Sequence, residues 1–345
     1  MSERGEKVLV VGPSWVGDMV MSQVLFRLLQ QTRPGVSIDV AAPAWSEPIL
    51  QRMPEVNSAI TKPIGHGEPA LGRRWKLGRT LRAEGYDQAI LLPNSFKSAL
   101  VPLFAGIPRR TGWRGEMRYG LLNDLRILDE NSYPLMVQQF AALGLDKGAS
   151  LPAQLPPPRL VVDPAQAARC RDKFALDEQR PLLALCPGAE FGGAKRWPAQ
   201  YYAELARQYL QAGWQVALFG SGNDQPVTAE IHAGSGDSCL DLAGKTTLAE
   251  AVDMLSLASA VVSNDSGLMH IAAALSRPLV VVYGPTSPGF TPPLNENSGV
   301  LVSDIDCAPC FQRECPLQHH RCMRDTPPAL VAAKLDGLLN RTEED

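Results

Sequence analysis

The sequence predicts an α/β protein of two domains, each built around a parallel β-sheet. Short apolar runs alternate with stretches of helical period along the whole chain, which is the pattern of repeated strand–helix–strand units. A length of 345 residues is more than one hydrophobic core usually organises. The alternation is interrupted at Pro152 and 156–158, where residues that fix φ and lack an N–H prevent a helix or central strand. We therefore expect domains at 1–155 and 156–325, and a C-terminal helix within 326–345 that packs back on the first domain.

The first half begins with a buried strand and its helix. Four apolar residues form the strand, and the following helix ends before Pro34, which cannot continue it. Two further apolar runs read as strands, and the second closes at Pro93 before another helical stretch. The expected strands are 8–11, 37–42 and 89–92, and the expected helices are 19–31 and 96–104.

The second half repeats this alternation. Each apolar run of four or five residues is followed by an amphipathic stretch long enough to cross back over a sheet. The expected strands are 182–186, 215–219, 239–243, 260–263 and 279–283. The expected helices are 199–211, 225–233, 248–257, 268–275 and 328–339.

The composition is that of an ordinary globular protein. Hydrophobic residues make up 45% of the chain and charged residues 20%. No apolar run approaches the roughly 18 residues that span a bilayer, and the polar segment 1–7 does not resemble a secretory signal. We expect a cytoplasmic protein.

Positive charge is concentrated in the first half. Residues 73–126 hold eleven basic and four acidic residues, a net charge of +7 within a chain whose net charge is −3. The basic residues within 73–82 form either the solvated face of a helix or a binding surface. The run 109–114 is less helical, and we expect it to meet an acidic partner, although so local a patch does not indicate nucleic acid. The candidate residues for that contact are Lys97, Arg110, Trp113 and Arg114.

Several nucleotide-binding signatures are excluded. The loop 12–17 and the segment 220–223 lack the G-x-G-x-x-G spacing of dinucleotide-binding folds. The run 244–246 resembles the end of a phosphate-binding P-loop, but Cys239 occupies the position of its first glycine. Nicotinamide-dependent and P-loop chemistry therefore lose their main support.

Two strand ends in the second half carry polar groups suited to a phosphorylated ligand. A glycine-rich loop, 187–198, follows the first strand and contains Lys195, whose ammonium group suits a diphosphate. The alternative is a charged loop packed over Trp197. The segment 264–270 opens a helix with Asp265, Ser266 and Gly267, followed by His270, so backbone N–H groups and polar side chains meet at one sheet edge. Its alternative is a helix cap with a core histidine.

A further carboxylate follows the first strand of the chain. Gly12 and Gly17 bracket a short loop, and Asp18 stands at the start of the next helix. Asp18 either caps that helix or accepts a proton from an incoming hydroxyl group.

Four of the seven cysteines are close in sequence, at Cys307, Cys310, Cys315 and Cys322. Four thiols can ligate a structural zinc ion, although this spacing differs from the common paired pattern. The alternative is reduced thiols in an irregular segment.

The longer motifs resemble the heptosyltransferase II group of glycosyltransferase family 9, found in Gram-negative bacteria. The resemblance extends from about residue 8 to residue 293, and the cysteine segment lies outside it. The motifs that carry it are 10–18, 92–99, 110–116, 186–191, 195–198 and 264–270.

This resemblance implies a GT-B fold, in which two Rossmann-like domains face each other across an interdomain cleft. It implies an inverting transfer of L-glycero-D-manno-heptose from ADP-L-glycero-β-D-manno-heptose to the first heptose of the acceptor, heptosyl-Kdo2-lipid A. The N-terminal domain would bind the acceptor, the C-terminal domain the donor, and no cofactor would be required. The enzyme would act transiently at the cytoplasmic face of the inner membrane.

The resemblance also implies roles for individual residues. Asp18 would be the general base and Lys195 a ligand of the donor phosphates. The remaining donor-binding candidates are Asp265, Ser266, Gly267, Leu268, His270, Asp224 and Glu190. Two rival functions on the same architecture are a nucleotide-sugar epimerase, which needs no acceptor, and a nucleotide-sugar-binding protein without catalysis.

Overall fold

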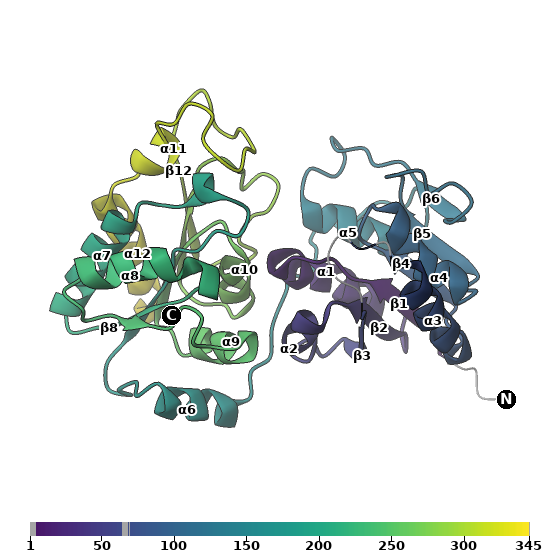
Figure 1. Cartoon of the computed structure of the whole chain (residues 1–345), viewed down its shortest axis with the longest axis horizontal. Helices are drawn as coiled ribbons and strands as arrows, with labels where there is room; N and C mark the ends of the chain where they lie inside the picture. Colours follow the sequence, from purple (N-terminus) through teal and green to yellow (C-terminus); the bar gives the residue numbers. More distant parts are fainter. Residues whose placement is uncertain (1–4, 64–67, 69, 345) are drawn as a thin grey trace. The chain divides into compact units, whose positions relative to one another are not determined.

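The computed structural model describes residues 5–63, 68 and 70–344, so residues 1–4 of the polar N-terminal segment lie outside the described part. The chain divides into two units, Met1–Pro158 and Arg159–Asp345 (Figure 1). The division lies three residues after the boundary predicted between residues 155 and 156. Each unit contains one six-stranded sheet in which every paired strand is parallel. The predicted α/β class is confirmed.

The first unit has the strand order β3-β2-β1-β4-β5-β6. Its strands are β1 (Lys7–Val11), β2 (Ser37–Ala42), β3 (Val56–Thr61), β4 (Gln88–Leu91), β5 (Arg109–Trp113) and β6 (Asp124–Arg126). Its helices are α1 (Val16–Thr32), α2 (Glu47–Leu50), α3 (Leu71–Leu81), α4 (Leu100–Phe104) and α5 (Met136–Gly144). Short 3₁₀ turns are η1 (Ala44–Ser46), η2 (Arg82–Glu84) and η3 (Phe96–Ala99).

The second unit has the strand order β12-β11-β10-β7-β8-β9. Its strands are β7 (Leu182–Cys186), β8 (Gln215–Leu218), β9 (Leu240–Asp241), β10 (Ala260–Asn264), β11 (Leu279–Tyr283) and β12 (Ser298–Val302). Its helices are α6 (Pro164–Lys173), α7 (Ala199–Gln211), α8 (Gln225–Gly234), α9 (Leu248–Ser256), α10 (Gly267–Ala274), α11 (Arg321–Arg324) and α12 (Pro328–Glu344). Two 3₁₀ turns are η4 (Gly193–Lys195) and η5 (Gly222–Asp224).

Both sheets have the doubly wound topology of dinucleotide-binding folds. Numbered within its own unit, each sheet runs 3-2-1-4-5-6, so the chain reverses direction across the sheet between β1 and β4, and again between β7 and β10. In such sheets the loops diverge at the reversal and leave room for a ligand at the carboxyl ends of the strands. The topology therefore directs attention to the loops after β1, β7 and β10.

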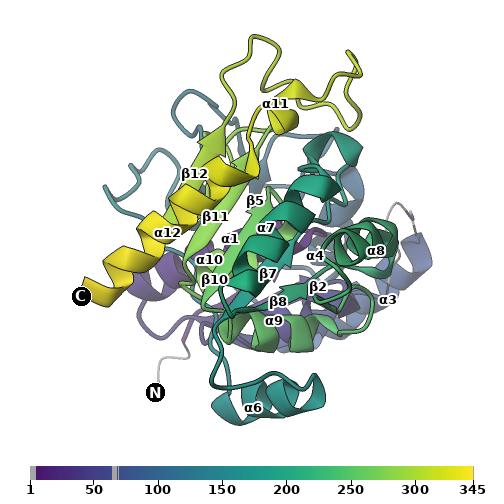
Figure 2. The ribbon, with the colours of Figure 1, turned by 90° about the vertical axis from the view of Figure 1, so that its left-hand side faces the viewer.

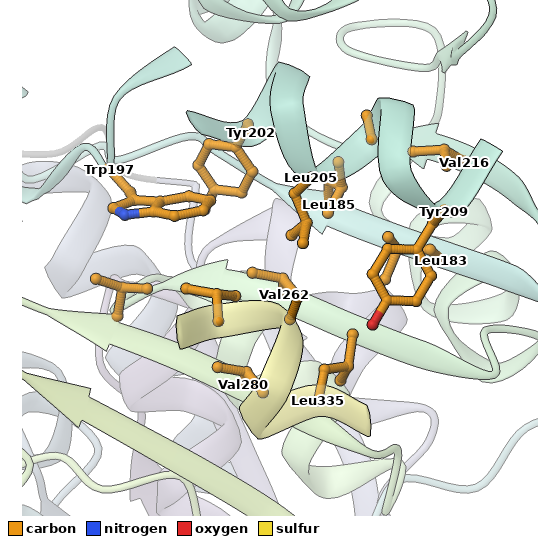
Figure 3. Packing of buried hydrophobic residues seen from close by; sticks show 14 of the residues in the cluster. Leu183, Leu185, Trp197, Tyr202, Leu205, Tyr209, Val216, Val262, Val280 and Leu335 are labelled. Carbon is orange, nitrogen blue, oxygen red and sulfur yellow. The ribbon is translucent and has the colours of Figure 1, made fainter. Parts of the chain in front are cut away.

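The core of the second unit lies under α7 and α12. Figure 3 shows Trp197, Tyr202, Leu205 and Tyr209 packed on apolar side chains of the central strands, with Leu335 contributed by α12. Alternate residues of a strand face opposite sides of the sheet, so each strand supplies only every second residue to this layer. Burying these side chains is the main stabilising contribution of the layer.

Helix α12 is the C-terminal helix expected within 326–345. It lies beside α7 over the second sheet (Figure 2), contacts β11 and β12, and belongs to the second unit. The Tyr209 hydroxyl donates a 2.7 Å hydrogen bond to Asp336 of this helix. The apolar positions of α12 are thus buried in the core of its own unit, and the packing of this segment on the first domain stays a prediction.

The strands that sequence analysis missed lie toward the edges of the sheets. β3 is half exposed and reads Val-Asn-Ser-Ala-Ile-Thr, and β5 begins with two arginines. Neither has the continuous apolar pattern of a central strand. Among the described residues, no helix combines the length and apolarity required to cross a membrane.

Candidate functional site

A charged pair stands where the second sheet reverses direction. Lys195, in the loop after β7, places its Nζ 2.6 Å from Oδ2 of Asp265, which directly follows β10. The Thr286 hydroxyl, beyond β11, donates to the same oxygen at 2.6 Å. The Lys195 ammonium also lies over the ring of Phe191, 5.0 Å from its centroid. Three loops thus converge at the predicted sheet edge, and Asp265 positions the lysine.

Asn264 fixes the shape of the loop that carries Lys195. Its side chain is fully buried at the end of β10. Its amide nitrogen donates to the Pro187 carbonyl at 2.7 Å, and its oxygen accepts from the Trp197 N–H at 3.1 Å and the Tyr202 hydroxyl at 3.0 Å. One asparagine therefore binds both ends of the loop 187–197.

We expect Asn264→Ala to lower the free energy of unfolding by about 3 kcal/mol or more. The substitution leaves the Pro187 carbonyl and the Trp197 N–H without their partner, whereas the Tyr202 hydroxyl keeps its bond to the Cys186 carbonyl. Each buried polar group left unpaired costs about 1–3 kcal/mol. Chemical denaturation measures the change. Asn223→Ala, at an exposed asparagine of the same unit, is the control and should change stability by less than about 0.5 kcal/mol. Equal stability of the two variants would contradict this account of the loop.

The start of α10 presents the other donor-binding candidates. Ser266 is the N-cap, and its hydroxyl accepts from the Met269 N–H at 3.4 Å. Gly267 begins the helix, Leu268 is half-buried, and His270 lies in the first turn and is buried. Sequence analysis offered helix capping and ligand binding as alternatives for this segment. Ser266 is the N-cap of α10, and its proposed role in donor binding stays a prediction.

His270 is expected to remain neutral through the physiological range. Burial lowers the pKa of His270 to about 4, although the Asp265 carboxylate partly opposes the shift. A neutral imidazole can both donate and accept a hydrogen bond, which suits a sugar hydroxyl.

Acidification should therefore destabilise the protein between pH 6.5 and about 4. Below pH 6.5 the unfolded state takes up a proton at His270 that the folded state refuses, so stability falls as pH falls, by up to about 3 kcal/mol from this residue. Denaturation of the wild type and His270→Gln at pH 7 and pH 4.5 measures this. The variant should lose less stability than the wild type over that interval. A larger loss in the variant would contradict the assignment.

Two other donor-binding candidates lie in different surroundings. The Asp224 carboxylate accepts from the Ser221 N–H at 2.9 Å and packs against Gly188, where an added Cβ would come within 2.6 Å of it. Asp224 thus joins the loops after β7 and β8. Glu190 is exposed on the loop that carries Lys195.

Asp18 is the third residue of α1 and is half-buried in the first helical turn. Trp15 holds the N-cap position, so the alternative of Asp18 as the N-cap residue is wrong. Gly12 lies in the loop before this helix. A Cβ atom added to Gly12 would come within 2.9 Å of the Met19 side chain, so glycine allows the loop backbone to pack closely against α1. Asp18 thus lies in the first turn of the helix that follows β1, a strand at the reversal point of the first sheet.

The structure adds a cation at this edge that sequence analysis missed. Lys62 follows β3, and its Nζ donates to the Gly12 carbonyl at 3.1 Å. Burial, with a smaller contribution from the Arg74 guanidinium, lowers the pKa of Lys62 to about 8. Lys62 directly follows a strand, and that position would have marked it as a candidate. Sequence analysis missed the residue because it did not predict β3.

The four candidates for the acidic partner divide into two kinds. Arg110 donates to the carbonyls of Leu121 and Ile107, and Trp113 is buried with its Nε1 bonded to the Gln139 carbonyl at 3.0 Å. Both side chains hold neighbouring backbone in place. Lys97 is half-buried in η3 and Arg114 is exposed, so these two remain predictions as ligand contacts.

The predicted zinc site is not formed. The structure contains Cys307, Cys310, Cys315 and Cys322 as free thiols. Across the described part of the chain, no group of three or more His, Cys, Asp or Glu side chains is placed to hold a metal ion. Burial raises the pKa of the Cys322 thiol, and the three other cysteines add to that shift.

This cysteine segment instead braces the loop that carries Lys195. Within the loop, the Ala194 N–H donates to the Arg313 carbonyl at 3.0 Å, and the Gly193 N–H donates to Glu314 at 3.2 Å. The Arg313 guanidinium lies 5.4 Å from the centroid of the Phe191 ring. Sequence analysis assigned the segment no such role, because the partners are more than a hundred residues apart.

Comparison with known proteins identifies the family. The model of glycosyltransferase family 9 (heptosyltransferase) matches residues 74–321. Lipopolysaccharide heptosyltransferase 2 of Escherichia coli strain K12 is 51% identical, over 98% of this chain and 99% of the relative. Lipooligosaccharide heptosyltransferase 2 of Haemophilus influenzae strain Rd is 48% identical, over 96% and 99%.

A solved structure agrees with these matches. The structure of E. coli ADP-heptose lps heptosyltransferase II aligns with a TM-score of 0.88 at 50% sequence identity, covering 98% of this chain and 99% of that chain. The predicted GT-B class is therefore confirmed. With a family model that spans most of its length and relatives near half identity, this chain belongs to glycosyltransferase family 9, the heptosyltransferases.

Proposed function

We propose that the protein is an inverting heptosyltransferase that moves L-glycero-D-manno-heptose from ADP-heptose to the first heptose of the lipopolysaccharide inner core. The similarity to two heptosyltransferases 2 across nearly the whole chain supports this choice of donor and acceptor. The observation that carries the chemistry is the Lys195–Asp265 pair at the reversal point of the second sheet.

The donor diphosphate is proposed to bind at this edge. As the bond between heptose and phosphate breaks, negative charge grows on the departing ADP. Lys195 and the N–H groups at the start of α10 would stabilise that charge more in the transition state than in the ground state. Asp265 would not contact phosphate, since two anions repel each other; it would hold Lys195 in position, and the neutral His270 would face the sugar.

The acceptor is proposed to bind on the first unit. Asp18 would remove the proton from the attacking hydroxyl while that oxygen forms the new bond to the anomeric carbon. Attack opposite the leaving phosphate inverts the configuration of that carbon. The proposed reaction needs no cofactor, because cationic and amide groups supply the stabilisation. The proposed location is the cytoplasmic face of the inner membrane, where a lipid-linked acceptor is accessible.

Release of ADP tests the proposal. Purified protein is incubated with ADP-heptose, with and without heptosyl-Kdo2-lipid A, and ADP and unchanged donor are quantified by chromatography. We expect ADP release only when acceptor is present. Conversion of the donor to another ADP-sugar without acceptor would favour an epimerase, and tight donor binding without turnover would favour a binding protein.

A further inference from the structure

Helix α3 of the first unit exposes an unusual combination of side chains. The helix lies beside α4 (Figure 1). Its inward face is Arg74, Gly78 and Leu81, and Gly78 allows the close contact with α4, since an added Cβ would come within 2.5 Å of Phe104. The outward face carries Leu71 and Trp75, which are 61% and 55% exposed. Large apolar side chains at such exposure do not stabilise the fold of this unit.

The same face is strongly basic. Residues 71–82 contain five Lys or Arg residues and no acidic residue, and all of the five except the buried Arg74 are exposed. Lys76, Arg79 and Arg82 are exposed, and none of the ion pairs within the described part of the chain involves them. The Arg79 guanidinium lies 5.9 Å from the centroid of the Trp75 ring, so cation and aromatic ring are presented together.

Two neighbouring segments extend this surface. Arg74 donates to the Lys97 carbonyl of η3 at 3.1 Å, and the Phe96 N–H donates to Glu116 at 2.7 Å, which links α3, η3 and the loop after β5. Phe96 and Met117 on these segments are 43% and 80% exposed. We call the side chains Leu71, Trp75, Lys76, Arg79, Phe96 and Met117 the basic–aromatic surface.

We propose that the basic–aromatic surface binds an anionic phospholipid bilayer. Cations near such a bilayer are attracted by about 1 kcal/mol each, and a tryptophan ring with neighbouring apolar side chains is stable at the headgroup boundary. Charge complementarity selects this partner, and the exposed Leu71 and Met117 match its apolar layer. The inference rests on the proposed function in one respect: a lipid-linked acceptor has to be reached at a bilayer.

Vesicle sedimentation tests the proposal with the full-length protein and no donor or acceptor. The wild type should bind vesicles that contain phosphatidylglycerol, lose that binding at high salt, and bind pure phosphatidylcholine weakly. Because the whole chain carries a net charge of −3, binding to an anionic membrane requires a locally basic surface. Lys76→Glu combined with Arg79→Glu should weaken binding by roughly tenfold or more. Trp75→Ala should weaken it with the charge unchanged.

The control is Lys147→Glu combined with Arg169→Glu, which makes the same change of charge at two exposed positions outside the surface. It should bind as the wild type does, and thermal unfolding verifies that each variant is folded. Absence of wild-type binding, equal binding by the α3 variants, or an equal loss in the control would each overturn the proposal. None of these outcomes bears on acceptor-dependent ADP release, so failure here is distinct from failure of the proposed function.

Discussion

Substitution of Asp18 by asparagine is expected to lower kcat by about 10²–10⁴, the usual contribution of a positioned general base. The amide has nearly the same size and keeps the first turn of α1 filled, but it cannot accept the proton of the attacking hydroxyl. Donor affinity should change little, because the donor is proposed to bind on the second unit. Steady-state kinetics with saturating acceptor, together with calorimetry for ADP, measure both quantities.

Asp146→Asn provides the matched control. Asp146 belongs to the same unit, its side chain is 87% exposed, and it pairs with Arg109 at 3.5 Å. Its substitution should leave kcat unchanged. Near-normal turnover of Asp18→Asn would reduce Asp18 to a residue that stabilises the start of a helix.

Replacement of Lys195 by alanine is expected to weaken ADP binding by about ten- to a hundredfold. A hydrogen bond between charged groups contributes about 1.5–3 kcal/mol, and the change also leaves the Asp265 carboxylate, which is 6% exposed, without its cation beside the proposed diphosphate site. Calorimetric titration with ADP measures the affinity, and the melting temperature shows whether the variant is folded.

Lys245→Ala is the control for this experiment. Lys245 is an exposed lysine of the same unit whose Nζ donates to the Asp241 carbonyl at 2.8 Å. Its loss should leave ADP affinity within about twofold of the wild type, as expected for an exposed lysine whose Nζ is bonded to a backbone carbonyl close to it in sequence. Equal ADP affinity of Lys195→Ala and the wild type would remove Lys195 from the site.

The central strands were predictable because their burial is encoded locally. The prediction for β7 and β11 matches the structure to the residue, since each is an uninterrupted apolar run covered on both faces. The edge strands were not predictable from that pattern. β5 has two arginines at its start, and the pairing of Arg109 with Asp124 of β6 becomes visible only once the strands are neighbours.

The candidate site likewise contains some residues that a local sequence pattern indicates and others that only the three-dimensional structure reveals. Lys195 and Asp265 could be singled out as candidates, because Lys195 lies in the glycine-rich loop after β7 and Asp265 directly follows β10. Thr286 also lies just beyond a predicted strand, β11. The contacts that Arg313 and Glu314 make with the loop join distant segments, which no local pattern encodes. Asn264 was recognised only as part of a motif, and its burial shows that it shapes the loop.

The cysteine segment shows why spacing alone was insufficient. Four thiols close in sequence allow a metal site, but their positions in three dimensions decide whether one exists. In the structure Cys322 lies on α11 against Gly284, where an added Cβ would come within 3.1 Å of its sulfur. Cys322 is thus packed within its unit, and although the other three cysteines act on its pKa, the described residues form no metal-binding group.

Mass spectrometry of the acceptor tests the central claim most directly. The protein is incubated with ADP-heptose and either heptosyl-Kdo2-lipid A or Kdo2-lipid A that lacks the heptose. We predict that the first acceptor gains the mass of one heptose and the second gains none. Transfer to the acceptor without heptose, or no mass gain on either acceptor, would contradict the assignment.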